Sequence, residues 1–376
     1  MRVALDARWN YHGGVGVYVA TVLEALPEAA ARQGIEIVAY ESPQRPVAQA
    51  HPNLRKIPLA VGCYSPKAQY ELALRARRDG IDVFHTPFYL APFLVKCPIL
   101  ITIHDLIPFL FPIYGPMHAA VVKAGYVASA KRATHVLAVS DTTRQDIQNI
   151  LKIDSAKVTR VYCGLRHHIF HPASDPREPA YLKQRYGIEQ PYVMVLSASN
   201  WKTKNLSAAL AAIEGARDRG AIPFQTVIAG SPVGLDQSGW RGRLRNAIAT
   251  GPVETEDMAK LYRNAALFVS LSRYEGFGLQ IAEGMASGTP CIASTEGSLP
   301  EIAGDGAVVC SPRETSAVAD TIVDLLADPQ RRMAISQKAL KRAARFSLAN
   351  VAEGLLDLYS GIATLKTTAG ERVRRE

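Results

Sequence analysis

Two glutamates, Glu275 and Glu283, frame the segment E-G-F-G-L-Q-I-A-E, whose residue types suit the binding of a polar ligand. The apolar residues 266–270 before it are typical of a buried strand, and residues 279–286 have a helical pattern. Free N–H groups at a helix N-terminus attract phosphate oxygens, and carboxylates accept hydrogen bonds from paired hydroxyls. The segment therefore predicts a site for a ligand with both groups, such as a nucleotide-sugar. The alternative is an ordinary helix start with surface acids, because short motifs often match by chance.

Glycines follow the first predicted strand of the chain, residues 2–6. Gly13, Gly14 and Gly16 precede Tyr18 where the first predicted helix begins. Their spacing does not match G-x-G-x-x-G, so a dinucleotide fingerprint is not indicated. Glycine lets the backbone approach a ligand closely, and the alternative is a tight turn that needs a positive φ.

Polar side chains follow two further predicted strands. His104 and Asp105 come directly after residues 99–103, and Lys204 comes a few positions after residues 192–197. A histidine in such a position can hydrogen-bond a sugar hydroxyl, and a lysine can neutralise a leaving diphosphate. The alternatives are a histidine packed in a loop and a solvated surface lysine.

Short apolar runs alternate with helical patterns, which predicts parallel sheets with helices on both faces. The alternation appears twice, before and after the segment 162–190, which has no clear period. We expect the interdomain linker there, and a ligand site in the cleft between the carboxyl ends of the two sheets. The predicted strands cover residues 2–6, 36–40, 83–86, 99–103, 135–140, 192–197, 225–229, 267–270, 290–293 and 307–310. The predicted helices include residues 17–32, 142–151, 206–219, 315–326, 329–346 and 348–365.

The composition is that of a soluble globular enzyme. The chain has 376 residues, which suggests two domains, with 48% hydrophobic and 20% charged residues. No apolar run reaches 18 residues, so we expect no transmembrane helix. The five cysteines are scattered and never form C-x-x-C, which favours reduced thiols in the cytoplasm over a disulfide or metal framework. His167, His168 and His171 have a helix-like metal spacing but no fitting carboxylate nearby, so we expect no metal site.

The net charge of +9 is unevenly distributed along the chain. Residues 1–170 carry 19 Lys or Arg against 12 Asp or Glu, whereas the remainder carries 24 against 22. A basic N-terminal half suits anionic lipid or a diphosphate-bearing acceptor. The alternative, nucleic acid, lacks a supporting motif, and we expect none to bind.

Taken together, these motifs resemble those of the retaining glycosyltransferases of family 4, which have the GT-B fold. The resemblance covers nearly the whole chain, from the glycine loop through His104-Asp105, Lys204-Asn205 and the segment from Glu275 to Glu283. It continues in S-G-T-P-C-I-A-S (287–294), G-S-L-P-E-I-A-G-D-G-A (297–307) and R-F-S (345–347). It implies two Rossmann-like domains whose parallel sheets face a central cleft. The implied parts are an acceptor domain (1–170), a linker (171–190) and a donor domain (191–347), with the helix 348–370 packing back onto the first domain.

The resemblance also implies a role for each matching residue. Glu275 holds the hydroxyls of the donor sugar, Glu283 binds the ribose, and Lys204 stabilises the departing diphosphate. His104 lies beside the sugar, and Gly14 approaches the diphosphate. The other implied donor contacts are Asn205, Gly276, Phe277, Gly278 and Leu279, and the implied acceptor contacts are Gly13, Gly16, Tyr18 and Asp105.

One position departs from the pattern of this family. Many members carry an arginine five positions before the lysine, where this chain has Ser199. We therefore assign Ser199 and Lys202 to the donor site; Lys202 is one candidate for the second phosphate cation, and the alternative is a lower donor affinity than is usual in the family.

The activity implied is metal-independent transfer of a hexosyl group, without a cofactor, to a hydroxyl of a glycan or polyprenyl-diphosphate-linked acceptor. The stretch I-H-D-L-I-P and Ser199 favour GDP-mannose as the donor, with UDP-glucose as the alternative. Polysaccharide biosynthesis in the cytoplasm, peripheral to the inner face of the plasma membrane, is the expected setting. Two other classes remain open: a GT-B epimerase acting on UDP-GlcNAc, and an inactive nucleotide-sugar-binding partner subunit. The presence of Lys204, Glu275 and Glu283 together argues against the inactive partner subunit.

Overall fold

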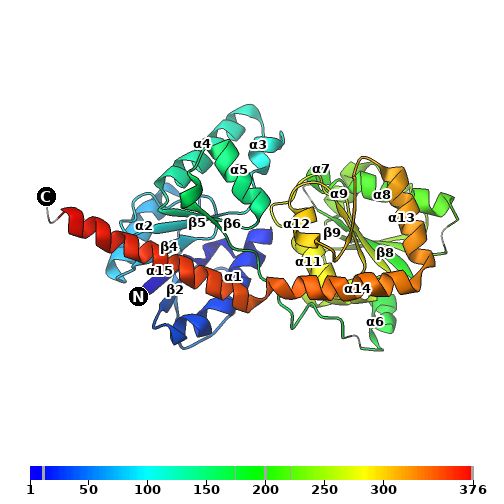
Figure 1. Ribbon diagram of the computed structural model, residues 1–376, viewed down its shortest axis with the longest axis horizontal. Helices are drawn as coiled ribbons and strands as arrows, with labels where there is room; N and C mark the ends of the chain where they lie inside the picture. The colour runs from blue at the N-terminus through cyan, green and yellow to red at the C-terminus, as the bar shows by residue number, and fades with distance from the viewer. Residues whose placement is uncertain (11–12, 174, 199–200, 221, 374–376) are drawn as a thin grey trace. The chain divides into compact units, whose positions relative to one another are not determined.

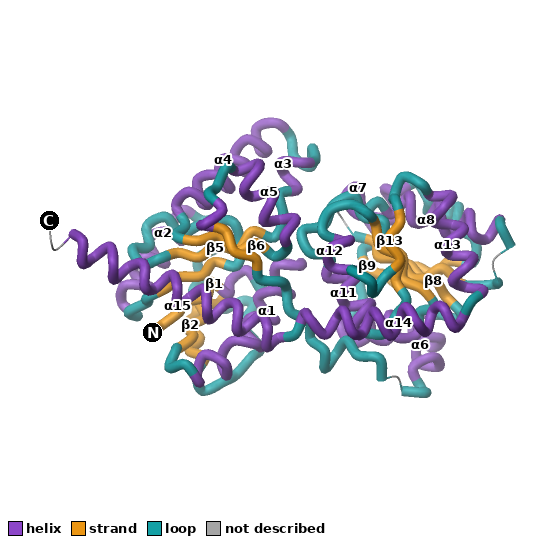
Figure 2. The backbone as a smooth tube through the Cα atoms, in the orientation of Figure 1, coloured by secondary structure: helices purple, strands orange, loops and turns teal. Residues whose placement is uncertain are grey.

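The computed structural model describes residues 1–376 except 11–12, 174, 199–200, 221 and 374–376 (Figure 1). The chain forms two compact units. Unit 1 combines Met1–Gly164 with Leu348–Glu376, and unit 2 is Leu165–Ser347. Each unit is built around a parallel sheet with helices on both faces, as predicted (Figure 2).

Unit 1 contains a seven-stranded sheet in the order β3-β2-β1-β4-β5-β6-β7, with every pair parallel. Its central strands are apolar and buried on both faces, as is typical of parallel sheets. The strands are β1 (Arg2–Asp6), β2 (Glu36–Glu41), β3 (Leu54–Pro58), β4 (Val83–Thr86), β5 (Ile99–Ile103), β6 (His135–Ala138) and β7 (Val158–Arg160). The longer helices are α1 (Gly13–Arg32), α2 (Pro66–Arg78), α4 (Pro116–Arg132), α5 (Asp141–Leu151) and α15 (Leu348–Val373), and α3 (Ile107–Leu110) is a single turn.

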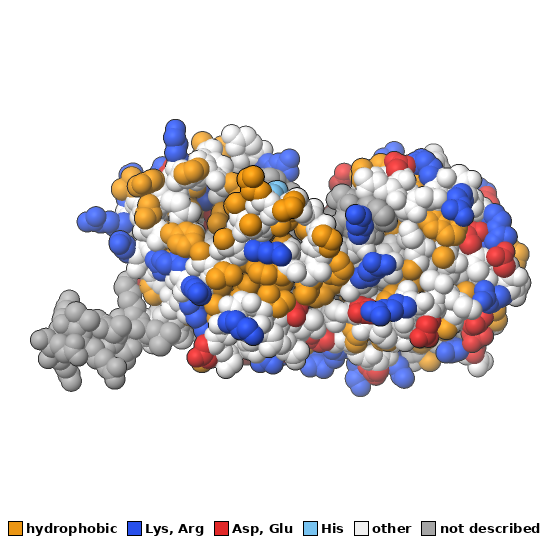
Figure 3. Space-filling model, turned by 90° about the horizontal axis from the view of Figure 1, so that it is seen from above, with side chains coloured by type: hydrophobic (Ala, Val, Ile, Leu, Met, Phe, Trp, Pro, Cys, Tyr) orange, Lys and Arg blue, Asp and Glu red, His pale blue; other side chains and the backbone are white. Residues whose placement is uncertain are grey.

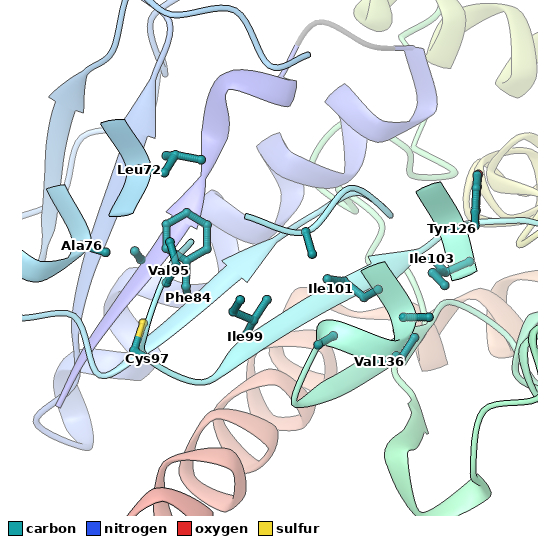
Figure 4. Close-up of a cluster of buried hydrophobic side chains, with 14 of the residues drawn as sticks. Leu72, Ala76, Phe84, Val95, Cys97, Ile99, Ile101, Ile103, Tyr126 and Val136 are labelled. Carbon is teal, nitrogen blue, oxygen red and sulfur yellow. The ribbon is translucent and has the colours of Figure 1, made fainter. Parts of the chain in front are cut away.

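The two faces of this sheet are covered by different helices. Alternate residues of β5 point to opposite faces, because the side-chain period of a strand is two. Ile99, Ile101 and Ile103 pack in one cluster with side chains of α2 and α4, among them Leu72 and Tyr126 (Figure 4). On the opposite face α1 packs against α15.

Helix α1 is, among the described helices, the one long and apolar enough to cross a membrane by length and composition alone. Half of the window that passes this test is buried inside the structure. The buried side chains include Val19, Val22 and Leu26, and α1 packs against α15 and β2. These contacts are those of a core helix.

Unit 2 contains a six-stranded sheet in the order β10-β9-β8-β11-β12-β13, again with every pair parallel. The strands are β8 (Tyr192–Ser197), β9 (Gln225–Gly230), β10 (Ala247–Gly251), β11 (Leu267–Ser270), β12 (Cys291–Ser294) and β13 (Val308–Cys310). The helices are α6 (Glu178–Tyr186), α7 (Trp201–Lys204), α8 (Leu206–Asp218), α9 (Pro232–Ser238), α10 (Thr255–Asn264), α11 (Leu279–Ala286), α12 (Leu299–Ala303), α13 (Thr315–Ala327) and α14 (Pro329–Ala343).

The expected linker, residues 171–190, is not an unstructured connection. It contains α6, which ends at Gly187 in the left-handed conformation. Arg263 pairs with Glu178 at 2.8 Å, which fixes α6 to α10. This ion pair is almost completely buried, so the segment is part of unit 2. The chain passes between the units at Gly164–Leu165 and again at Ser347–Leu348.

Candidate functional site

The candidate residues of unit 1 lie at the carboxyl ends of β1 and β5. Gly13 begins α1 with a φ of +48°, so the turn itself requires glycine at this position. A Cβ added at Gly13 or Gly14 would meet no described atom within 4 Å. Gly16 and Tyr18 follow on the same helix and are buried. The N-terminal turn of α1 therefore leaves space beside its first two glycines.

His104 is held in one orientation by its surroundings. Its Nε2–H donates to the carbonyl oxygen of Pro87 at 2.9 Å, and the Tyr18 ring meets it edge-on with centroids 4.9 Å apart. Burial lowers the pKa of His104 to about 4, although the bond to Pro87 opposes this shift. The imidazole is therefore neutral at pH 7, and its Nδ1 can accept a hydrogen bond from a hydroxyl.

The other two unit 1 candidates have internal partners. Asp105 accepts a hydrogen bond from the N–H of Ile107 at 3.0 Å, at the start of α3. The hydroxyl of Tyr18 lies 3.4 Å from Thr102 Oγ1 in the core. Tyr18 and Asp105 were both predicted to contact an acceptor; in the structure Tyr18 makes a buried contact with His104, and Asp105 accepts a hydrogen bond at the start of α3.

In unit 2 a lysine and a glutamate form an ion pair. The Nζ of Lys204 lies 2.7 Å from Oε1 of Glu275, and both side chains are mostly buried. Gln280 Nε2 donates to the same oxygen at 3.0 Å. Among the residues that the structure describes, no hydrogen bond reaches Oε2 of Glu275. That oxygen is therefore available to accept a hydrogen bond from a ligand hydroxyl.

Close backbone packing fixes the position of Glu275. Gly278 has a φ of +95°, and a Cβ there would lie 2.5 Å from Leu299. A Cβ at Gly297 would lie 2.8 Å from the backbone nitrogen of Glu275. Ser298 donates its backbone N–H to the Glu275 carbonyl at 3.2 Å and its hydroxyl to the Phe277 carbonyl at 2.7 Å. The glycines of two separate motifs thus let two loops pack directly on each other.

Helix α11 begins directly after this turn. Gly278 is its N-cap and provides no side-chain cap, so the first backbone N–H groups have no acceptor within the helix. Phe277 is buried, and its ring meets Phe346 edge-on at 5.3 Å. Gly276 is also buried, and Leu279 is half-buried. A helix start of this kind carries partial positive charge that suits a phosphate or a sugar oxygen.

Glu283 lies one turn further along α11. Burial raises the pKa of its carboxyl to about 7, and the positive charges of Arg166 and Lys204 act in the opposite direction. The electrostatic effect of Lys204 thus extends to both glutamates. A carboxyl with this pKa changes its charge near neutral pH.

The remaining donor-site candidates lie around α7. Lys202 and Lys204 belong to this helix, and Asn205 follows it with a φ of +52°. The Thr203 carbonyl accepts a hydrogen bond from the Arg273 N–H at 2.7 Å, which joins α7 to the loop after β11. Ser199 lies outside the described residues.

Two side chains near the glutamates did not stand out in the sequence. Gln280 lies inside the E-G-F-G-L-Q-I-A-E segment, so its place between the two glutamates was a usable signal. Arg166 lies in the segment 162–190, where no motif marks it. Among the residues described, no group of three or more His, Cys, Asp or Glu side chains is placed to hold a metal ion.

Two family models match the chain. "Glycosyl transferases group 1" matches residues 181–342, and "Glycosyltransferase Family 4" matches residues 12–169. The chain is 29% identical to the O-antigen chain mannosyltransferase B of Escherichia coli over 321 residues, which cover 81% of each chain. It is 25% identical to the D-inositol 3-phosphate glycosyltransferase of Xylanimonas cellulosilytica over 384 residues, covering 93% of this chain and 91% of that one.

Solved structures show the same fold. The sucrose-phosphate synthase of Thermosynechococcus elongatus matches with a TM-score of 0.77 and 22% identity, covering 97% of this chain and all of that one. Anabaena Alr3699/HepE, solved in complex with UDP-glucose, matches with a TM-score of 0.71 and 16% identity, covering 96% of this chain and all of that one.

Proposed function

The chain belongs to the group 1 glycosyltransferases of the GT-B fold, and we propose that it transfers a mannosyl group from GDP-mannose to an acceptor hydroxyl. The acceptor of this proposal is a glycan or a lipid-linked oligosaccharide in polysaccharide assembly. The anomeric configuration is retained, and neither a metal nor a cofactor takes part. The similarity to an O-antigen mannosyltransferase supports the choice of sugar and of pathway class.

The observation that carries the proposal is the Lys204–Glu275 pair beside the start of α11. An ammonium and helix N–H groups offset the charge of a diphosphate, and a carboxylate oxygen that accepts no hydrogen bond from the described residues can accept one from a sugar hydroxyl. When a donor binds, its phosphate competes with Glu275 for Lys204. Unit 2 thus contains groups of both signs that a nucleotide-sugar needs.

The chemical step follows from this arrangement. The bond between the sugar C1 and the diphosphate oxygen breaks, and a bond from C1 to the acceptor oxygen forms on the same face. The acceptor proton passes to the departing phosphate oxygen, whose negative charge Lys204 and α11 stabilise. Glu275 positions the sugar in unit 2, and in unit 1 the neutral His104 has an Nδ1 that can accept a hydrogen bond from a hydroxyl.

A UDP-sugar is the second donor to test, because the structurally similar Alr3699/HepE is solved with UDP-glucose. The relationship to a D-inositol 3-phosphate glycosyltransferase makes a small phosphorylated alcohol the second acceptor class. An epimerase or an inactive binding subunit would differ from a transferase in its products.

The decisive experiment is calorimetric titration of the purified chain with GDP-mannose, UDP-glucose and UDP-GlcNAc, followed by product analysis. We expect GDP-mannose to bind most tightly, and slow donor hydrolysis to accompany it without an acceptor. With an acceptor, proton NMR of the product should show the anomeric configuration of the donor. EDTA should leave the rate unchanged.

Three results would overturn parts of this proposal. Preference for a UDP-sugar would replace the donor, and an inverted product would exclude the retaining step. Release of free sugar epimer without an acceptor would replace transfer with epimerisation. Binding without any turnover would make the chain a partner subunit.

A further inference from the structure

Four tyrosines from separate segments of unit 1 come together near the carboxyl ends of its strands. Tyr89 follows β4, and Tyr126 belongs to α4. Tyr64 and Tyr114 lie in the loops before α2 and α4. Burial raises the pKa of Tyr89 to about 12, with smaller contributions from the neighbouring hydroxyls of Tyr64 and Tyr114. The same neighbours contribute to the raised pKa of Tyr126. We use the name tyrosine cluster for Tyr64, Tyr89, Tyr114 and Tyr126.

Ring contacts fix this cluster in place. The rings of Tyr89 and Tyr126 stack with centroids 3.7 Å apart, and the Phe88 ring lies 4.5 Å from that of Tyr89. Phe88 packs in turn on Trp9 at 4.2 Å, and Trp9 meets the Tyr64 ring edge-on at 5.2 Å. Because aromatic pairs at these distances stabilise each other, the loops that carry the rings are held together.

The protein does not use all the hydroxyls of the cluster. Tyr126 is only 6% exposed, yet its hydroxyl forms no hydrogen bond with a residue that the structure describes. The same holds, within the described part of the chain, for the hydroxyls of Tyr89 and Tyr114. Two other tyrosines of this unit, Tyr40 and Tyr359, each have a side-chain partner below 3 Å. Since buried polar groups are normally bonded, an unbonded hydroxyl at Tyr126 points to a ligand.

The tyrosine cluster lies next to His104. Phe88 and Tyr89 directly follow Pro87, whose carbonyl oxygen accepts the hydrogen bond from His104 Nε2. Asp105, the residue after His104, acts electrostatically on a member of the cluster, Tyr126. Phenol hydroxyls, a neutral imidazole and a carboxylate are therefore gathered at one edge of the sheet.

This region is open to solvent. Tyr64 is 61% exposed and Tyr114 is 39% exposed, whereas Phe88 and Tyr89 are half-buried. Figure 3, which looks onto the side of unit 1 that carries α3 and α4 in Figure 1, shows hydrophobic side chains, tyrosine included, gathered there. A ligand can therefore reach the rings from outside.

A neutral sugar ring fits this combination of groups. One face of a pyranose presents C–H groups that pack on an aromatic ring, and its edge presents hydroxyls that bond to phenols and carboxylates.

A phosphorylated alcohol fits the region less well, because its phosphate needs a cation. Among the described residues, Lys123 contacts a ring here, with Nζ 5.5 Å from the centroid of Phe109. Arg8, the residue before Trp9, is bonded to both carboxylate oxygens of Asp6.

We propose that the tyrosine cluster binds a neutral sugar ring of a glycan, with the C–H face of the sugar against an aromatic ring and its hydroxyls bonded to Tyr89, Tyr114 and Tyr126. The inference deepens the proposed function, on which it rests for its purpose. The bound sugar is the end of the acceptor, so the acceptor is a glycan and not a small phosphorylated alcohol.

The test is saturation-transfer NMR of the full chain, without donor, against mannotriose and separately against inositol 3-phosphate. We expect transfer to the C–H protons of mannotriose. Tyr64→Ala should weaken mannotriose binding about five- to tenfold, because a ring contact is lost. Tyr89→Phe keeps the stacked ring and removes one hydroxyl, so binding should weaken about threefold.

Tyr70→Ala is the matched control, because Tyr70 of α2 is 73% exposed and contacts no other ring among the residues described. It should bind mannotriose as the wild type does, and calorimetry should give all three variants the GDP-mannose affinity of the wild type. The inference is overturned if the wild type does not bind mannotriose, if inositol 3-phosphate binds more tightly, or if Tyr64→Ala and Tyr70→Ala behave alike. Absence of GDP-mannose binding, with Tyr64→Ala still weakening mannotriose binding, would remove the proposed function and leave the sugar site standing.

Discussion

The buried polar residues around His85 and His104 in unit 1 are neutral, apart from the Arg8–Asp6 ion pair of that unit, whereas Lys204 and Glu275 in unit 2 are charged. In unit 1 His85 Nδ1 lies 2.7 Å from the hydroxyl of Tyr359, and His85 Nε2 lies 2.8 Å from Thr102 Oγ1. Thr102 also meets Tyr18, which packs on His104. Burial lowers the pKa of His85 to about 3, with a smaller effect from His104, so both rings are uncharged at pH 7.

In unit 2 the corresponding groups are either charged or change their charge near neutral pH. Lys204 and Glu275 pair through one carboxylate oxygen, and Glu283 has a pKa of about 7. Neutral hydrogen bonds at close distances hold a fixed geometry, whereas an ion pair can exchange its partner for a charged ligand. We therefore predict that the polar groups around His85 keep a fixed geometry, and that the Lys204–Glu275 pair changes its partners when a donor binds.

Replacement of Lys204 should give the largest effect. Lys204→Ala removes the ammonium that offsets the diphosphate, so we expect kcat to fall about 10²–10³-fold, with a smaller change in KM. Lys204→Arg keeps the charge and should recover part of the rate. Steady-state kinetics with a saturating acceptor measures both.

Lys183→Ala is the control for this prediction. Lys183 also pairs with a glutamate, Glu189, at 3.0 Å, but both side chains are largely exposed. Its rate should match that of the wild type, because exposed ion pairs contribute little. A kcat for Lys204→Ala within about threefold of the control would mean that the Lys204 ammonium does not contribute to catalysis.

The contribution of the buried polar residues around His85 to the stability of unit 1 is tested by Tyr359→Phe. The change leaves His85 Nδ1 without its partner in the core, so local stability of unit 1 should fall by about 1–3 kcal/mol. Hydrogen exchange of the amides of β4 and β5 measures this loss. Tyr70→Phe is the control, since Tyr70 is exposed and should change stability by less than about 0.5 kcal/mol. Equal exchange in the two variants would mean that the buried hydroxyl does not stabilise unit 1.

The charge on Glu283 should make donor affinity depend on pH. An ionised carboxylate accepts hydrogen bonds from both ribose hydroxyls, whereas the protonated form accepts fewer. Because the pKa of Glu283 is about 7, affinity should rise up to about tenfold between roughly pH 6 and pH 8. Calorimetry of Glu283→Gln should show a weaker, pH-independent affinity. The same slope in wild type and variant would assign the titration to another group.

The pattern of buried strands was readable from the sequence, but three of the four edge strands were not. The predicted strands include all of those in the middle of both sheets, such as β5 and β11, because long apolar runs are typical of them. The strands that were missed, β3, β7 and β10, all lie at sheet edges. These three strands are partly exposed, so neither a continuous apolar run nor a clear alternation marks them.

The candidate site shows a similar division. The E-G-F-G-L-Q-I-A-E segment made Glu275 a candidate, because a strand, a glycine turn and a helix follow each other directly in the chain. Its pairing with Lys204 joins residues that lie far apart in sequence, and no spacing rule predicts such a contact. The packing of Gly297 on Glu275 and the raised pKa of Glu283 likewise depend on three-dimensional burial.

His85 and His104 of unit 1 and Glu283 of unit 2 should also respond to acid in opposite directions. The pKa values of His85 and His104 are lowered from 6.5, so folded unit 1 binds fewer protons than the unfolded chain. The stability they give is present above pH 6.5 and is lost as the pH falls toward about 4. The pKa of Glu283 is raised from 4.5 to about 7, so folded unit 2 binds more protons. The contribution of Glu283 to stability therefore increases as the pH falls from about 7 toward 4.5.

The smallest predicted effect is therefore a difference between the units in hydrogen exchange. Acidification from about pH 7 to about pH 5, after correction for the intrinsic exchange rate, should reduce protection in β4 and β5 more than in β11 and α11. Glu283→Gln removes the compensating group, so protection in unit 2 should then fall with acid more steeply than in the wild type. Parallel losses in both units, unchanged by this substitution, would mean that the neutral histidines and the titrating glutamate do not distinguish the two halves.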